Sequence, residues 1–185
     1  MDGRDKPGHD GEPSCRPSSS RLGLSLKLLL AAVGRLKAGP ERELFDRYAK
    51  RAASLASGVG LSGFAVREFD ESRARTVEER RAAEARALID AAGRDAFICA
   101  LDERGAAIAS AAWATEIARA RDAGRATYAV VVGGPDGLDP ELRVAARSMV
   151  AFGALTWPHQ LVRVMAAEQI YRCFTIMAGH PYHRA

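Results

Sequence analysis

The sequence has only three cysteines in 185 residues, Cys15, Cys99 and Cys173, and they lie far apart. An odd number at such spacing is not typical of a disulfide framework. Cys99 and Cys173 fall in apolar runs, which predicts that both pack as small buried hydrophobic residues. The chain is therefore expected to work in a reducing compartment, and we expect it in the cytoplasm.

The signatures of several function classes are also missing. No run approaches the roughly 18 apolar residues of a membrane helix. Lys27 interrupts "LGLSLKLLLAAVG", a segment that resembles the core of a signal peptide. The G-x-S-x-G elbow of a serine hydrolase, the P-loop lysine and the dinucleotide-binding glycine spacing are absent. These absences disfavour those classes and predict no membrane partner.

Lysine is absent after Lys50, so every later cation is an arginine. Two interpretations stay open: a codon bias in an Ala/Arg-rich genome, and recognition of phosphates by guanidinium groups. The net charge of +4 suits an RNA-facing surface without establishing one. A charge this mild would not bind naked RNA tightly, which favours a shaped particle as the partner.

Composition divides the chain into a tail and one domain. Residues 1–23 are rich in Gly, Pro, Ser and Asp, which predicts a disordered tail or a mis-started extension. Residues 24–185 alternate between apolar runs and amphipathic segments, which is typical of an α/β fold with a mainly parallel sheet. The predicted strands cover 24–34, 61–69, 96–101, 127–134 and 149–156, and the predicted helices cover 40–56, 76–93, 110–124, 139–148 and 158–179.

Helix starts carry their own signals. Thr76 with Glu79 predicts a capping box, and Asp139 before Pro140 predicts another N-cap. Ser110 is the predicted N-cap of the helix over 110–124. The last helix, 158–179, is apolar nearly all round, so we expect one side against the sheet and the other against a second copy of the chain. Its Glu168 and Arg172 have the spacing of an ordinary ion pair, which we prefer to a catalytic role.

Two strand ends could form a ligand site. "VVVGGPDGLDPEL" (130–142) combines a strand, a glycine-rich turn and a helix, and ligands bind beyond the carboxyl ends of parallel strands. Gly133 and Gly134 would let a ligand approach the backbone, and Gly137 permits a positive φ. Taken alone, this loop could equally be a plain tight turn. "FGALTWPHQLVR" (152–163) is the second strand end, and its His159 is a candidate catalytic, capping or core residue.

The chain closes with "GHPYHRA", residues 179–185. His183 and Tyr182 are candidate proton-transfer groups, and Arg184 is a candidate anion clamp. Cys173, His180 and His183 could converge on a metal, but their spacing matches no closed zinc site. We therefore expect no metal.

Four stretches in this order resemble a known family. These are "LDERG" (101–105), "VVVGGPDGL" (130–138), "LTWPHQLVRVMAAEQIYR" (155–172) and "GHPYHR" (179–184). Together they resemble the ribosomal large subunit methyltransferase H family of SPOUT-class enzymes. The resemblance covers about residues 25–184. It implies methylation of N3 of pseudouridine 1915 in 23S rRNA, with S-adenosylmethionine as cofactor and the assembled ribosome as substrate.

The resemblance also implies a particular site. It implies a SPOUT-type parallel-sheet α/β fold with a deep trefoil knot at the carboxyl end, a rare exception to unthreaded chains. It implies a homodimer in which the tail of one subunit approaches the cofactor of the other. The cofactor contacts carried over are Leu101, Gly133, Phe152, Gly153, Ala154, Leu155, Thr156 and Trp157.

Two positions depart from the family pattern. Trp157 stands where a leucine is common, and Gln160 stands where a proline is common. Trp157 adds bulk near the adenine, so it would stack on the adenine or narrow the pocket.

We expect His183 to take the N3 proton, Tyr182 to orient the base and Arg184 to hold a phosphate or carbonyl. His159 is a competing base. Another SPOUT enzyme with a ribose or tRNA target and a non-catalytic ribosome-binding module are the alternatives.

Overall fold

In a computed structural model of the protein, residues 25–183 are described. The predicted tail over residues 1–23 and the candidate Arg184 lie outside the described residues. Five parallel strands form one sheet in the order β2-β1-β4-β3-β5. The strands are β1 (Lys27–Val33), β2 (Gly63–Phe69), β3 (Phe97–Ala106), β4 (Thr127–Val132) and β5 (Ser148–Val150).

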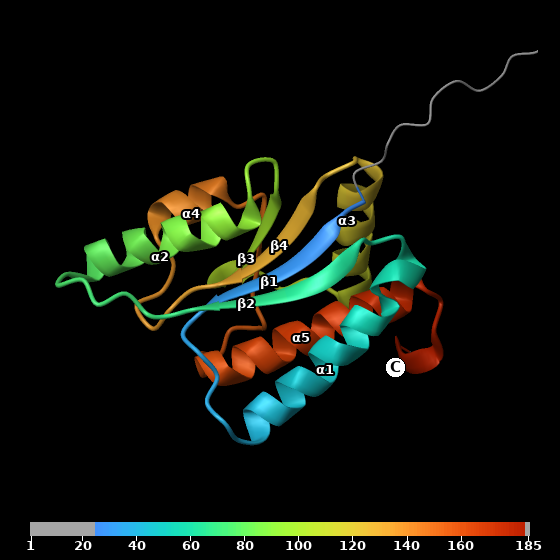
Figure 1. Ribbon diagram of the computed structural model, residues 1–185, viewed down its shortest axis with the longest axis horizontal. Helices are drawn as coiled ribbons and strands as arrows, with labels where there is room; N and C mark the ends of the chain where they lie inside the picture. The colour runs from blue at the N-terminus through green and yellow to red at the C-terminus, as the bar shows by residue number, and fades with distance from the viewer. Residues whose placement is uncertain (1–24, 184–185) are drawn as a thin grey trace, which may run out of the picture.

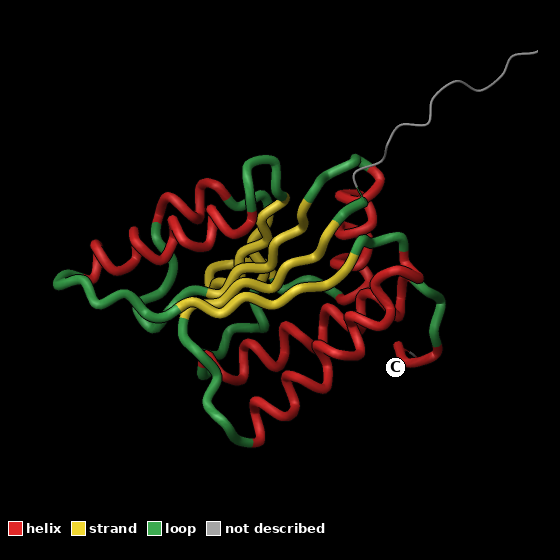
Figure 2. Tube along the Cα trace, in the orientation of Figure 1, coloured by secondary structure: helices red, strands yellow, loops and turns green. Residues whose placement is uncertain are grey.

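Helices cover both faces of this sheet (Figures 1 and 2). Helices α2 and α4 contribute to the apolar cluster on one face, and α1, α3 and α5 contribute to the cluster on the other. The helices are α1 (Pro40–Ala56), α2 (Val77–Ala92), α3 (Ser110–Asp122), α4 (Pro140–Ala145) and α5 (His159–Met177), with short 3-10 turns η1 (Ser57–Val59) and η2 (Pro181–His183). The predicted parallel α/β fold is confirmed, whereas the trefoil knot stays a prediction.

The burial pattern explains why these runs form a parallel sheet. In β1 every residue from Leu28 to Val33 is buried, because helices cover the strand on both faces. Helix α5 is also buried on more than one side, and it packs against α1 and α3 below the sheet. Its predicted contact with a second copy stays a prediction.

Three local expectations are wrong. β5 ends at Val150 instead of continuing to residue 156, and the chain then forms a loop in which Gly153 has φ 100°. β3 continues to Ala106 through a register irregularity, past its predicted end at Leu101. Ala109, not Ser110, is the N-cap of α3, because the Ser110 hydroxyl donates to Gln169 Oε1 at 2.7 Å.

The other helix starts follow the sequence signals. The Thr76 and Glu79 capping box is present, and the Asp139 carboxylate caps α4 ahead of Pro140. Both arrangements supply acceptors to backbone N–H groups that the first helical turn leaves unpaired.

One polar chain crosses the core between the sheet and α3. Trp113 Nε1 donates to the Tyr128 hydroxyl at 2.8 Å, and this hydroxyl donates to Glu116 Oε1 at 2.5 Å. The Tyr128 ring stacks on Phe97 with centroids 5.0 Å apart. Two of the cysteines, Cys99 and Cys173, are fully buried free thiols, as predicted.

The buried thiols of Cys99 and Cys173 and the buried Tyr128 hydroxyl make the stability of the fold sensitive to high pH. Burial raises the pKa of Cys99 to about 11, and burial also raises the pKa values of Cys173 and Tyr128. The unfolded chain releases these protons from about pH 8.5–10, while the folded chain keeps them. Above that pH range, each of these groups should therefore lower the free energy of unfolding by up to ~1.4 kcal/mol for every pH unit.

Urea unfolding at pH 8 and pH 10 measures this effect. We expect a lower free energy of unfolding at pH 10, and a smaller loss in Cys99→Ala. Equal free energies at the two pH values would contradict the burial argument.

Candidate active site

A cavity of about 290 Å³ opens at the carboxyl ends of β3, β4 and β5. This is the edge where open α/β sheets bind their ligands. The lining comes from residues 101–103 in the middle of β3, from residues 132–138 at and beyond the end of β4, and from the segment that follows β5. His159 and Val162, at the start of α5, also contribute.

The loop after β4 is a tight glycine turn. Gly137 has φ 85°, a conformation that favours glycine, and its N–H donates to the Gly134 carbonyl at 3.0 Å. A Cβ placed on Gly133 would lie 2.6 Å from Leu138 Cδ2, so a larger residue there would require the Leu138 side chain to shift. Residues 133–138 of this turn line the cavity, and the positive φ of Gly137 is what requires a glycine there.

Two arginines of α2 fix this turn from outside. Arg80 Nε contacts Asp136 Oδ2 at 2.6 Å, and Arg81 Nε donates to the Asp136 carbonyl at 2.6 Å. The hydrogen bond from Arg80 holds the pKa of the Asp136 carboxyl below its usual value. This carboxylate is therefore an ionised anchor for the loop and is unsuited to act as a base near neutral pH.

A second ion pair fixes the cavity wall that β3 forms. Arg143 Nε contacts Asp102 Oδ2 at 2.9 Å, and Asp102 Oδ1 accepts from the Arg104 N–H at 2.9 Å. The Asp102 side chain is almost fully buried. This pair ties the irregular end of β3 to α4, so that Glu103 remains as an exposed carboxylate in the cavity lining.

The loop after β5 offers unused backbone polar groups. Within residues 25–183, the main chain of 153–157 makes no hydrogen bond to another backbone group. Residues 153–157 are exposed, so water solvates these groups and a ligand can replace it. The open apolar cavity beside these free donors and acceptors therefore fits a ligand that pairs with the main chain.

The structure brings most of the predicted cofactor residues together. The exposed Ala154 lies on the same loop but outside the cavity lining. Residues that do line the cavity include Leu101, Gly133, Phe152, Gly153, Leu155, Thr156, Trp157 and the candidate base His159.

The predicted tail residues lie elsewhere in the same chain. Tyr182 belongs to η2, which follows the far end of α5, whereas His159 begins that helix at the cavity (Figure 1). A helix of 19 residues is about 28 Å long. The tail and the cavity of one chain are therefore separated by the length of α5. The side chain of His183 lies outside the described part of the chain.

Tyr182 is held in an aromatic and ionic cluster. Its hydroxyl donates to Glu168 Oε1 at 3.3 Å, and its ring lies 4.7 Å from Tyr171 and 5.1 Å from the Arg172 guanidinium. Arg172 also pairs with Glu168 at 2.8 Å, which confirms the predicted ion pair. Burial, then the hydrogen-bonded neighbours, raise the pKa of Tyr182 to about 12. The phenol therefore stays protonated and can donate a hydrogen bond.

A buried arginine not singled out from the sequence holds the first turns of α5. Arg163 is only 4% exposed, and its Nη2 donates to the Val33 carbonyl at the end of β1. Its Nη1 lies 3.2 Å from Glu68 Oε1, and Glu68 also pairs with Arg42 at 2.7 Å. Because Val162 precedes it in the cavity lining, Arg163 fixes one wall of the site.

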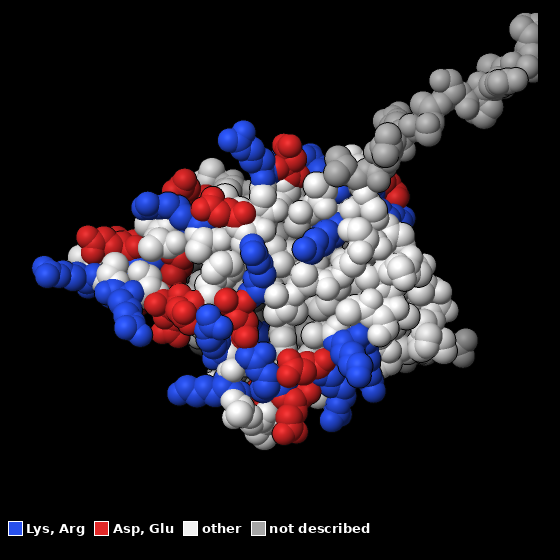
Figure 3. Space-filling view, viewed as in Figure 1, with Lys and Arg blue, Asp and Glu red and all other residues white. Residues whose placement is uncertain are grey.

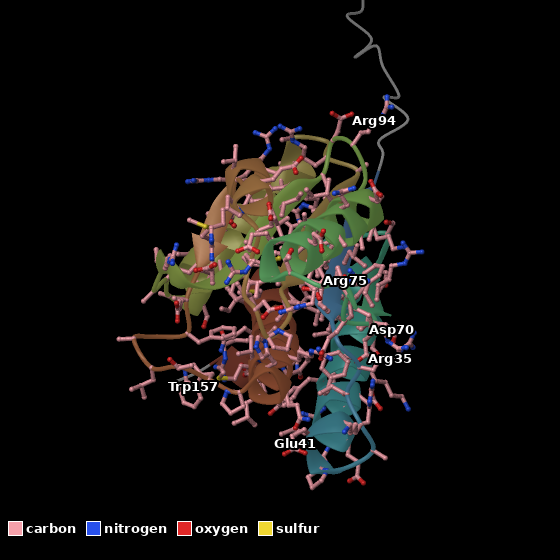
Figure 4. The ribbon with its side chains drawn as sticks, turned by 90° about the vertical axis from the view of Figure 1, so that its left-hand side faces the viewer. Arg35, Glu41, Asp70, Arg75, Arg94 and Trp157 are labelled. Atoms are coloured by element: carbon pink, nitrogen blue, oxygen red, sulfur yellow. The ribbon has the colours of Figure 1, made fainter. Side chains whose placement is uncertain are left out.

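Arg163→Met should lower the free energy of unfolding. The loss should be smaller than the ~3–5 kcal/mol of a broken buried pair, because Glu68 keeps Arg42. Arg35→Met is the matched control, since the Arg35 and Asp70 pair is exposed (Figure 4) and should give no measurable change. Urea unfolding of both variants measures the two losses of unfolding free energy. Equal losses in Arg163→Met and Arg35→Met would contradict the structural role of Arg163.

Residues 25–183 contain neither a membrane-spanning helix nor a metal-binding cluster. No helix within 25–183 is long and apolar enough to cross a membrane. In that range, no three His, Cys, Asp or Glu side chains form a group that could hold a metal ion.

Comparisons with known proteins identify the family. Residues 26–183 match a family described as "Predicted SPOUT methyltransferase". A ribosomal RNA large subunit methyltransferase H from Nitrobacter winogradskyi is 54% identical over 159 residues, 86% of this chain and 99% of the relative. The protein of that name from Brucella anthropi is 49% identical over 160 residues, 86% of this chain and all of the relative.

Similarity to solved structures is more distant. The SpoU methyltransferase AviRb from Streptomyces viridochromogenes, solved in complex with AdoMet, has 12% identity and a TM-score of 0.33. The match covers 84% of this chain and 62% of that one. The family model and the curated relatives therefore establish the relationship: the chain belongs to the SPOUT methyltransferases, within the ribosomal RNA large subunit methyltransferase H family.

Proposed function

We propose that the protein methylates N3 of a pseudouridine, position 1915, in 23S rRNA of the assembled ribosome. The observation that carries this proposal is the cavity at the carboxyl ends of β3, β4 and β5 of a chain 54% identical to a ribosomal RNA large subunit methyltransferase H. Action on ribosomal RNA would place the protein in the cytoplasm.

The cavity residues fit S-adenosylmethionine, the methyl donor of SPOUT methyltransferases. The apolar side chains of Leu101 and Leu138 suit an adenine ring, and the free main chain of 153–157 suits its polar edge. When bound, the cofactor supplies an electrophilic methyl group on a sulfonium. The chain's own contribution is to hold that group in line with the nucleophile and to exclude water, which can lower the barrier by ~7–11 kcal/mol.

A base must remove the N3 proton of the target. His159 lines the cavity of its own chain, and His183 would have to come from another subunit. We favour His183 as the general base, with Tyr182 orienting the pseudouridine and Arg184 holding a phosphate or carbonyl. His159 stays the competing candidate.

This assignment requires a homodimer. The length of α5 separates the tail from the cavity within one chain, so a tail can act only at a partner's cavity. Exposed apolar side chains beside the cavity supply a surface for the partner: Leu155 is 70% exposed, Leu161 39% and Trp157 37%. Burying such a patch against a second copy would stabilise the dimer.

The charge distribution favours a shaped substrate. Lys and Arg mix with Asp and Glu over the side of the molecule that carries α2 and the strand ends, and the opposite side of that view has few charges (Figure 3). A mixed surface with a net charge of +4 gives limited attraction to naked RNA. Recognition of an assembled ribosome by shape would compensate for this.

The test is nucleoside mass spectrometry. Ribosomes from a strain that lacks the modification are incubated with purified protein and S-adenosylmethionine, beside protein-free rRNA and tRNA controls. We expect one added methyl on the pseudouridine base in ribosomes. Methylation of a ribose or of tRNA would contradict the proposed target, and no transfer to any RNA would contradict the proposed enzyme.

A further inference from the structure

Trp157 closes the loop after β5 on itself. Its Nε1–H donates to the Phe152 carbonyl at 3.1 Å, so one side chain bridges the two ends of the segment 152–157. Gly153, with φ 100°, provides the bend between them. Within the described residues the main chain of 153–157 has no backbone partner, so this side-chain contact is a hydrogen bond that joins the two ends of the loop.

The acceptor end of this bridge is anchored in the core. The Phe152 ring lies 6.3 Å from the Trp113 ring. Trp113 is 2% exposed and donates in turn to the Tyr128 hydroxyl. Trp157 thereby connects a loop of exposed residues to the rigid polar chain between α3 and the sheet.

From this geometry we propose that Trp157 is a positioning residue that holds the cofactor loop in its binding conformation before the cofactor arrives. The proposal rests on the proposed function, since it assigns a role at the same site. Trp157 lies at the end of the molecule that carries the strand ends (Figure 4) and lines the cavity. A loop that is ordered in advance loses less conformational entropy on binding, which strengthens affinity.

The chemistry of the side chain makes the idea specific to this chain. Only an indole combines a large ring with an N–H donor that accepts nothing in return. Leucine has neither the ring nor the donor, and phenylalanine keeps an aromatic ring without the N–H. The two replacements therefore separate the hydrogen bond from the bulk of the ring.

Cofactor affinity is measured by calorimetry with S-adenosylmethionine on the full chain and on Trp157→Phe and Trp157→Leu. We expect both variants to bind about 3- to 10-fold more weakly, the effect of one lost hydrogen bond. KM for the cofactor should rise by the same factor with kcat within about 2-fold. Val144→Ala, at an exposed site outside the cavity lining, is the matched control and should bind normally.

A second measurement needs no cofactor. The chain has two tryptophans, so the indole N–H region of an NMR spectrum contains two signals, and Trp157→Phe identifies one of them. We expect the Trp157 indole proton to exchange with water several-fold more slowly than a free indole. Exchange at the free rate would overturn the proposal.

The outcomes separate this proposal from the proposed function. Normal affinity in Trp157→Phe with weak binding in Trp157→Leu would mean that the ring stacks on the cofactor, which overturns the positioning role. A wild-type chain that binds no S-adenosylmethionine would contradict the proposed function, and the indole exchange rate would still decide whether the loop is held.

Discussion

His183→Ala is expected to lower the rate of methyl transfer to ribosomes by about 10²–10⁴-fold, the usual effect of losing a general base. Its affinity for S-adenosylmethionine should stay within about 2-fold. The residue belongs to η2, at the far end of α5 from the cavity of its own chain. Its loss should therefore leave the cofactor loops unchanged and remove only the proposed general base.

The competing histidine provides the comparison. His159 lines the cavity, so His159→Ala should weaken cofactor binding as well as transfer if it has a binding role. Single-turnover rates and calorimetry on both variants distinguish the two. Full transfer by His183→Ala together with loss of transfer by His159→Ala would show that the base is His159.

Gly105→Ala is expected to have the second-largest effect, because the obstruction is backbone. A Cβ at Gly105 would lie 2.6 Å from the Val150 carbonyl carbon and 2.7 Å from its nitrogen. Main-chain atoms of a strand cannot move aside as a flexible side chain can. The variant should lose ~1–3 kcal/mol or more of unfolding free energy. Displacement of β5 should also misplace the loop 152–157 and weaken cofactor binding.

Gly58→Ala is the matched control for this substitution. A Cβ at Gly58 meets no atom within 4 Å, and its backbone is not in the left-handed region. Alanine there should be neutral or stabilising by ~0.4–1 kcal/mol, because it restricts the unfolded chain. Urea unfolding of the two variants decides, and a Gly105→Ala protein as stable as Gly58→Ala would contradict the close packing of β3 on β5.

The sequence predicts the sheet well because its central strands are unbroken apolar runs. β1 and β4 are buried on both faces, which removes the ambiguity of alternating patterns. β5 is mispredicted because "MVAFGALT" is apolar throughout, yet only its first residues pair with β3. Gly153 then turns the chain, and Leu155 and Thr156 line the cavity instead of continuing the strand.

The site is less predictable because part of it depends on long-range ion pairs. The glycine turn and the loop after β5 follow from the motifs, but Arg143 comes from α4 and pairs with Asp102 across 41 positions. Arg163 pairs with Glu68 across 95 positions. No local pattern specifies which carboxylate an arginine will meet, so both contacts require the folded chain.

The central claim is that one chain's cavity works with another chain's tail. Mixing two inactive variants tests this claim directly. The first, His183→Ala, lacks the tail histidine, and the second, Thr156→Trp, has its cavity filled. After dissociation and random reassociation, half of the dimers are mixed, and each has one intact cavity facing one intact tail. The account predicts recovery of about a quarter of the wild-type transfer rate. No recovery in the mixture, with both variants folded and dimeric, would contradict it.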